Sequence, residues 1–243
     1  MPGFWKTLKK WLGDAYDYLG LVLVSSFVWF GVTLGGLAVL TSIGLFKHPI
    51  ALLAGAASLY VFLIAPVTAG VYVLARKMVT RDDPSVMDIV LGFREFLVAS
   101  WALGFAQVLV TLAIAVNAWF YLSHGGIALK LLGVLAAYVL LLWALSATYH
   151  FPTMIEQRPG VLKILKRGFL LALDNLGFTC GVFFVIILLT CFCAVTLLGL
   201  PLLYLGLVSI LHTRALRALF VKYEILPPER EPVPEEGPGF RIG

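Results

Sequence analysis

Five long stretches without a charged residue constrain most strongly what this chain can fold into. They are Tyr18–Phe46, His48–Ala75, Phe96–Leu129, Leu131–Ile155 and Asn175–Thr213. Each exceeds the roughly 20 apolar residues that an α-helix needs to cross a hydrocarbon core of about 30 Å. The last stretch is long enough for two crossings and contains a turn signal at residues 198–201. The chain is therefore predicted to cross a membrane six times, near residues 19–42, 50–75, 97–121, 127–150, 176–198 and 201–221.

The composition excludes a soluble domain. The mean hydropathy is +0.98, and only 13% of the residues are charged. The short alternating segments of a membrane β-barrel are not found in the sequence. Because lipid cannot satisfy free backbone groups, each span must form its own hydrogen bonds as a helix. We expect an all-α integral membrane protein with about six transmembrane helices.

The positions of the basic residues predict the orientation. All of the 18 Lys and Arg residues except Lys47 and Lys130 fall in segments on one side of the six predicted spans. Segments rich in Lys and Arg are retained in the cytoplasm during insertion. We therefore expect a multi-pass membrane protein with both termini in the cytoplasm.

Basic side chains on that face are candidates for contact with anionic lipid headgroups, which attract Lys and Arg at roughly 1 kcal/mol each. The candidates are Arg76, Lys77, Arg81, Lys163, Lys166, Arg167, Arg214 and Arg217. The lipid bilayer, with anionic lipids in its inner leaflet, is thus the first expected partner. Nucleic acid is not an expected partner, because no basic segment interleaved with aromatic residues lies on a soluble domain.

Two amphipathic segments on this face resemble each other. Residues 83–97, DPSVMDIVLGFREFL, align with residues 158–173, RPGVLKILKRGFLLAL, when one residue is inserted. Each follows a span that enters the cytoplasm and precedes a span that leaves it, so each is predicted to be an interfacial helix. The chain is then predicted to contain two parallel helix–elbow–helix repeats, at about residues 50–121 and 127–198. The alternative is that any two amphipathic elbows look alike.

The ends of the chain differ from this membrane domain of residues 19–222. Residues 1–18 have Phe4, Leu8 and Trp11 opposite Lys6 and Lys9, which predicts an amphipathic interfacial helix. Residues 223–243 are rich in proline and of mixed charge, which predicts a disordered cytoplasmic tail.

The sequence offers little that predicts catalysis. No Asp, Glu, Lys or Arg lies in the central part of a predicted span, where ionisable residues usually mark a functional path. We expect no catalytic residue, no cofactor and no metal site. Tyr149, His150 and His212 are candidates for a polar cluster at the cytoplasmic ends of two spans. Hydrogen-bonded interface histidines are the favoured interpretation, because no metal spacing or nucleophile accompanies them.

Small residues and prolines predict how the spans pack and bend. Gly31, Gly35 and Gly36 give the first span a small-residue face that is suited to close helix contact. Pro66 and Pro152 each remove a backbone donor and are expected to bend their helices.

The segments APVTAGVYVLARKMVTRDDPSVMDIVLGFREFLVASW and TYHFPTMIEQRPGVLKILKRGFLLALDNLGFT resemble the two elbows of the YesL-like family of bacterial membrane proteins. The resemblance covers roughly residues 4–222. It implies no catalytic residues, and an accessory role beside carbohydrate transport or sensing systems. We therefore expect a non-catalytic accessory or scaffold protein that binds another membrane protein complex. The alternative is a small solute or lipid transporter with a cavity between the two hairpins, lined by Gln107, Asn117, Tyr138 or Tyr149.

Overall fold

A computed structural model describes residues 3–44, 49–124 and 126–227, and contains no strand within them. The helices are α1 (Phe4–Asp17), α2 (Leu19–Ser42), α3 (Pro49–Leu59), α4 (Ala65–Thr80), α5 (Met87–Glu95), α6 (Leu97–Ser123), α7 (Ile127–Ala147), α8 (His150–Gln157), α9 (Val161–Asp174), α10 (Leu176–Thr196) and α11 (Leu205–Lys222). Two π-helical turns, η2 (Tyr60–Ile64) and η3 (Leu200–Tyr204), join α3 to α4 and precede α11. Lys47 and most of the predicted tail, residues 228–243, lie outside the described residues.

Six helices in the described part of the chain are long and apolar enough to cross a membrane. They are Leu19–Ser42, Pro49–Thr80, Leu97–Ser123, Ile127–Ala147, Leu176–Thr196 and Leu200–Lys222. The predicted spans are confirmed in number and approximate position, which indicates an all-α multi-pass membrane protein. The fourth ends earlier than predicted, because the chain turns at Thr148 and Tyr149 before the separate helix α8.

Within the described residues, one order of helices occurs three times. A short helix (α1, α5 or α9) leads through a single residue into a long helix (α2, α6 or α10). A second, interrupted helical segment follows each time: α3 with α4, α7 with α8, and η3 with α11. The two predicted elbows correspond to α5 and α9, and α1 occupies the same place in the first group.

The last parts of the three interrupted segments form the core of the molecule. Helix α4 packs against α8 and α11, and the short helices α5, α9 and α1 pack on α4, α8 and α11 respectively. Most of α4 is buried (12 of 16 residues), as is most of α11 (12 of 18). We call α4, α8 and α11 the core helices.

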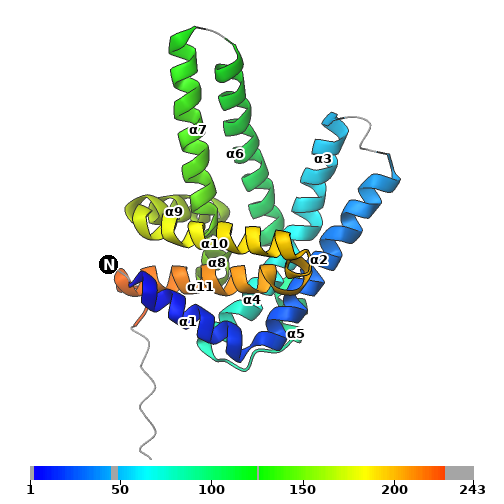
Figure 1. The fold of residues 1–243 in the computed structure, drawn as a ribbon, viewed down its shortest axis with the longest axis vertical. Helices are drawn as coiled ribbons and strands as arrows, with labels where there is room; N and C mark the ends of the chain where they lie inside the picture. Colours follow the sequence, from blue (N-terminus) through cyan, green and yellow to red (C-terminus); the bar gives the residue numbers. More distant parts are fainter. Residues whose placement is uncertain (1–2, 45–48, 125, 228–243) are drawn as a thin grey trace, which may run out of the picture.

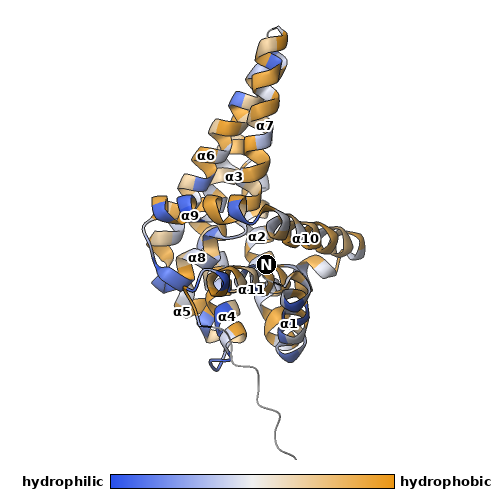
Figure 2. Ribbon diagram, turned by 90° about the vertical axis from the view of Figure 1, so that its left-hand side faces the viewer, coloured by the Kyte–Doolittle hydropathy of each residue, from blue (hydrophilic) through white to orange (hydrophobic). Residues whose placement is uncertain are grey.

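Two hairpins diverge from this core, as Figure 1 shows. We call the α2–α3 hairpin arm 1 and the α6–α7 hairpin arm 2. Helices α10 and α11 run crosswise beneath them, so the six long helices do not form a parallel bundle. Hydrophobic residues cover most of the length of arm 2, whereas hydrophilic residues gather around α1, α5, α9 and the ends of the core helices (Figure 2).

Prolines explain where the interrupted segments break. Pro66 lies in the first turn of α4, directly after η2, and Pro201 lies inside η3. Proline has no N–H, so the carbonyl four residues earlier loses its helical partner. For Pro66 that carbonyl belongs to Phe62, and the Trp101 indole N–H of α6 donates to it at 3.2 Å. The break is thereby tied to the neighbouring helix.

Candidate functional site

Three aromatic rings, one from each core helix, stack in the centre of the core. Tyr72 of α4 lies between Phe151 of α8, with ring centroids 5.5 Å apart, and His212 of α11, with centroids 6.0 Å apart. The Tyr72 hydroxyl and His212 Nδ1 are hydrogen-bonded at 2.5 Å. Tyr72 and Phe151 are buried, so the rings close the middle of the core instead of lining a path through it.

The core helices also meet in a charged triad. The buried Glu156 carboxylate of α8 bonds to Arg76 of α4 at 3.3 Å and to Arg217 of α11 at 2.7 Å. Because one carboxylate bridges two guanidinium groups, the triad joins the same three helices as the ring stack. The arrangement positions helices and presents no group that is placed for proton transfer to a substrate.

A buried ion pair attaches α1 to the core. Asp14 of α1 accepts two hydrogen bonds from Arg214 of α11, with Nη2 at 2.8 Å and Nε at 2.5 Å from the carboxylate. The two side chains are only 3% and 8% exposed. The sequence prediction missed Asp14, although an acidic residue on the same helical face as Trp11 was a usable signal.

The predicted lipid contacts must be corrected in the light of these pairs. Arg214 is buried and cannot reach a headgroup, while Arg76 and Arg217 are bonded to Glu156. Lys77 pairs with Asp88, and Arg81 pairs with Asp17. Burying a cation requires a nearby anion, and the acidic residues of the same face provide it. Arg76, Lys77 and Arg81 keep 42%, 35% and 67% of their side chains exposed despite these pairs. Together with the exposed Lys163, Lys166 and Arg167 of α9, they remain predicted lipid contacts.

The predicted polar cluster does not form. Tyr149 bonds to Thr179 at 2.7 Å, His150 to Gln107 and Ser146, and His212 to Tyr72. Tyr149 and His150 are neighbours in the chain, but their side chains bond to different long helices. The expectation failed because the sequence places them at the same depth without fixing the direction of either side chain.

His150 instead belongs to a buried chain of hydrogen bonds. The Tyr60 hydroxyl donates to Gln107 Oε1 at 2.6 Å, and Gln107 Nε2 donates to His150 Nδ1 at 2.9 Å. His150 Nε2 then lies 3.3 Å from Ser146 Oγ. Burial lowers the pKa of His150 to about 4, so the ring is neutral and can accept at Nδ1 while donating from Nε2.

An apolar cleft of about 310 Å³ lies between the arms, lined by α3, α6 and α7. Its lining residues are Leu53, Ala56, Ala57, Tyr60, Gln107, Val108, Thr111, Leu112, Trp143 and Ala147. The four polar residues among them bond to the protein: Tyr60 to Gln107, Gln107 also to His150, and Trp143 Nε1 to Thr111 Oγ1 at 2.9 Å. The cleft therefore presents a surface suited to an apolar occupant.

The predicted small-residue face of α2 is only partly used. A Cβ on Gly36 would collide with Leu59 of α3, whereas one on Gly31 or Gly35 would meet nothing within 4 Å. Close packing between the two helices of arm 1 thus involves Gly36 alone among the three.

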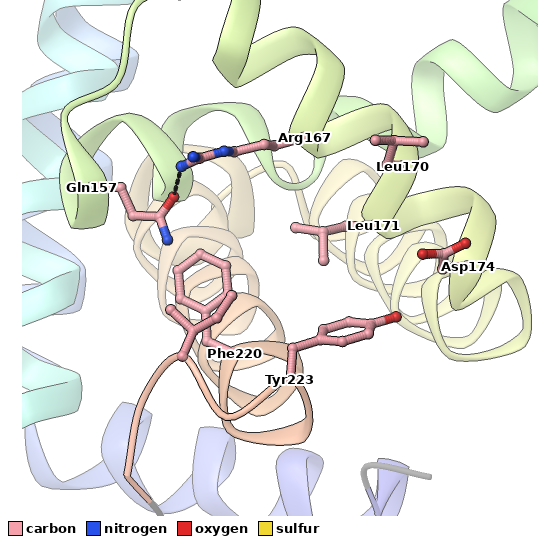
Figure 3. A pocket seen from close by; sticks show the side chains of 8 residues that line it. Gln157, Arg167, Leu170, Leu171, Asp174, Phe220 and Tyr223 are labelled. Atoms are coloured by element: carbon pink, nitrogen blue, oxygen red, sulfur yellow. Dashed lines mark hydrogen bonds between the residues drawn. The ribbon is translucent and has the colours of Figure 1, made fainter.

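A second, open groove of about 530 Å³ lies between α9 and the end of α11. It is lined by Gln157, Arg167, Leu170, Leu171, Asp174, Phe220, Tyr223 and Ile225. Figure 3 shows Arg167, bonded to Gln157, at one end, Asp174 at the other, and Phe220 and Tyr223 opposite Leu171.

The described residues contain no group of three or more His, Cys, Asp or Glu side chains that could hold a metal ion. Comparison with protein-family models, with curated proteins and with solved structures finds no match for this chain. The fold therefore assigns this chain to the class of multi-pass membrane proteins. Its resemblance to the YesL-like family stays a prediction.

Proposed function

We propose that this protein is a non-catalytic scaffold of the bacterial inner membrane, whose two arms hold membrane helices of a partner complex. The cleft between the arms carries the proposal: it is apolar, and its polar side chains bond to the protein itself. Recognition of a polar solute needs polar groups directed at that solute. An apolar helix needs only a complementary surface.

The distribution of burial supports this proposal. Only 3 of the 21 residues of α7 and none of the 11 residues of α3 are buried, so the arms have large apolar surfaces available for other helices. Gly31 and Gly35 leave open space on α2, which would let a partner helix approach closely. The rings of Tyr72, Phe151 and His212, in contrast, stack on one another in the core.

The class of partner follows from the resemblance stated above. A YesL-like protein is expected beside a carbohydrate transport or sensing system, so a complex of that kind is the proposed partner. The proposed orientation has both termini in the cytoplasm, with α9 against anionic headgroups. The proposed repeats at residues 50–121 and 127–198 each combine the interrupted segment of one group of helices with the short and long helices of the next group.

The alternative, a lipid transporter or facilitator, is favoured by the same cleft, because an acyl chain is also an apolar occupant. A solute transporter has less support. Of the four residues expected to line its cavity, only Gln107 lines the cleft. Asn117 and Tyr138 are exposed, and Tyr149 is buried against Thr179.

Affinity purification in native nanodiscs, followed by mass spectrometry, tests the proposal when two matched variants are included. Ala57→Trp fills the cleft, because Ala57 lines it. Ala54→Trp adds the same side chain one turn away at an exposed position that is not among the lining residues. We expect the wild type and Ala54→Trp to retain a stoichiometric membrane protein partner, and Ala57→Trp to lose it by at least about tenfold.

Equal loss or equal retention in the two variants would contradict the scaffold proposal. So would a purified wild type that carries no protein in stoichiometric amount. A phospholipid that is retained by the wild type and lost from Ala57→Trp would instead establish the lipid-handling alternative.

A further inference from the structure

In each of the three groups of helices, the end of the short helix lies near the end of the core helix. We call this place the junction of the group. Each short helix ends in an acidic residue: Asp17 in α1, Glu95 in α5 and Asp174 in α9. Each core helix is followed by a residue with positive φ: Arg81 after α4, Arg158 after α8 and Glu224 after α11. At two junctions these residues form ion pairs, Arg81 with Asp17 at 3.4 Å and Arg158 with Glu95 at 2.5 Å.

The third junction has the wrong charge for this pairing. The residue with positive φ after α11 is Glu224, which follows the C-cap residue Tyr223 and has the same charge as Asp174, so it cannot form this ion pair. The chain holds α9 to α11 in another way: Lys222 donates to Asn175 Oδ1 at 2.5 Å, and Asn175 Nδ2 bonds to the Tyr223 hydroxyl at 2.9 Å. The groove of about 530 Å³ lies here, with the exposed Asp174 at one end.

The groove combines a carboxylate with apolar walls. Leu170, Leu171, Phe220 and Ile225 supply the apolar surface, while Arg167 at the far end already bonds to Gln157. A complementary occupant has a guanidinium group for Asp174, flanked by apolar side chains. Such an arginine would take the part that Arg81 and Arg158 play at the other two junctions.

We propose that the C-terminal segment of this chain, residues 228–243, binds in the groove through Arg241. The segment contains two arginines. Arg230 stands between Glu229 and Glu231, which would bring further negative charge towards Asp174. Arg241 stands between Phe240 and Ile242, which match the apolar walls.

The position and length of the segment permit this contact. Ile225, which lines the groove, is three residues before the segment begins. Residues 228–239 can span up to about 37 Å when extended at about 3.1 Å per residue. The part of α9 from Arg167 to Asp174 is only about 10 Å long, at about 1.5 Å per residue. A tethered segment of this length has an effective concentration in the millimolar range, so modest contacts suffice for occupancy.

Disulfide trapping in the full-length chain tests the proposal. In a background with Cys180, Cys191 and Cys193 replaced by Ala, Leu170→Cys is combined with Ile242→Cys, which keeps both Asp174 and Arg241. The matched control combines Leu170→Cys with Glu231→Cys, which is nearer in sequence. We expect mild oxidation to trap the first pair within one chain at least about fivefold faster than the second.

Charge variants then identify the contact. Arg241→Glu in the first pair should reduce trapping to the control rate, Arg230→Glu should not, and Asp174→Arg added to Arg241→Glu should restore it. All of these positions are exposed or in the tail, and size-exclusion profiles check that each variant is folded. Equal rates for the two cysteine pairs, or trapping between two chains, would overturn the proposal. So would trapping that Arg241→Glu leaves unchanged, or that Asp174→Arg fails to restore.

Discussion

The core helices are less apolar than the helices of the arms, and their surroundings differ as well. Helix α4 buries 12 of its 16 residues, whereas α7 buries 3 of 21. The core contains the stacked rings, the Arg76–Glu156–Arg217 triad and the Asp14–Arg214 pair. In the arms, α2 packs on η3 and α11 as well as on α3, and α7 packs on α9 as well as on α6. The helices that pack into the core are thus the less apolar ones, and their polar side chains make the contacts between them.

The largest expected effect comes from breaking the buried ion pair of the core. Asp14→Asn keeps the shape of the side chain but leaves the Arg214 charge without its carboxylate, which should lower the free energy of unfolding by about 3–5 kcal/mol. Circular dichroism during unfolding in a fixed detergent measures this change in the free energy of unfolding. Asp17→Asn is the control, because its ion pair is largely exposed and should cost under about 1 kcal/mol. Equal losses of unfolding free energy in the two variants would contradict the expected difference between the buried and the exposed ion pair.

Acidification should weaken the core through His150. Burial lowers its pKa to about 4, from an ordinary value of 6.5, so the folded state resists taking a proton that the unfolded chain accepts. The stability that neutral His150 provides is complete above pH 6.5 and is lost as the pH falls towards 4, by an amount on the order of 3 kcal/mol.

Equilibrium unfolding at a series of pH values measures this loss. His150→Gln, which cannot be protonated in this range, should flatten the profile between pH 6.5 and 4. An unchanged slope in that variant would assign the pH dependence to other groups.

The smallest expected effect comes from glycine substitutions that compare a core helix with an arm helix. A Cβ on Gly206 of α11 would lie 2.7 Å from the Val22 carbonyl oxygen, while one on Gly31 of α2 would meet nothing within 4 Å. Gly206→Ala should cost about 1–3 kcal/mol through overpacking. Gly31→Ala should change the free energy of unfolding by less than about 0.5 kcal/mol. The same unfolding assay compares them, and a large effect of Gly31→Ala alone would mean that the arms pack more tightly than described.

Several features of the fold could be predicted from the sequence. The predictions for Arg214, His150 and His212 were wrong, each for a physical reason that can be named. The spans followed from hydropathy, and the break at Pro66 followed from the missing N–H. Arg214 was misplaced at the lipid surface because its partner, Asp14, is 200 residues away. His150 and His212 were grouped by depth, but they bond to Gln107 and Tyr72.

The sequence by itself determined that this is a helical membrane protein with six candidate spans, because apolar length and backbone hydrogen bonding are local properties of a segment. Only the tertiary structure decided that α4, α8 and α11 form the core, that Glu156 bridges two arginines, and that a groove lies beside Asp174. These outcomes depend on which side chains from distant segments meet. Such meetings are set by the relative rotation and crossing of whole helices, which no local pattern encodes.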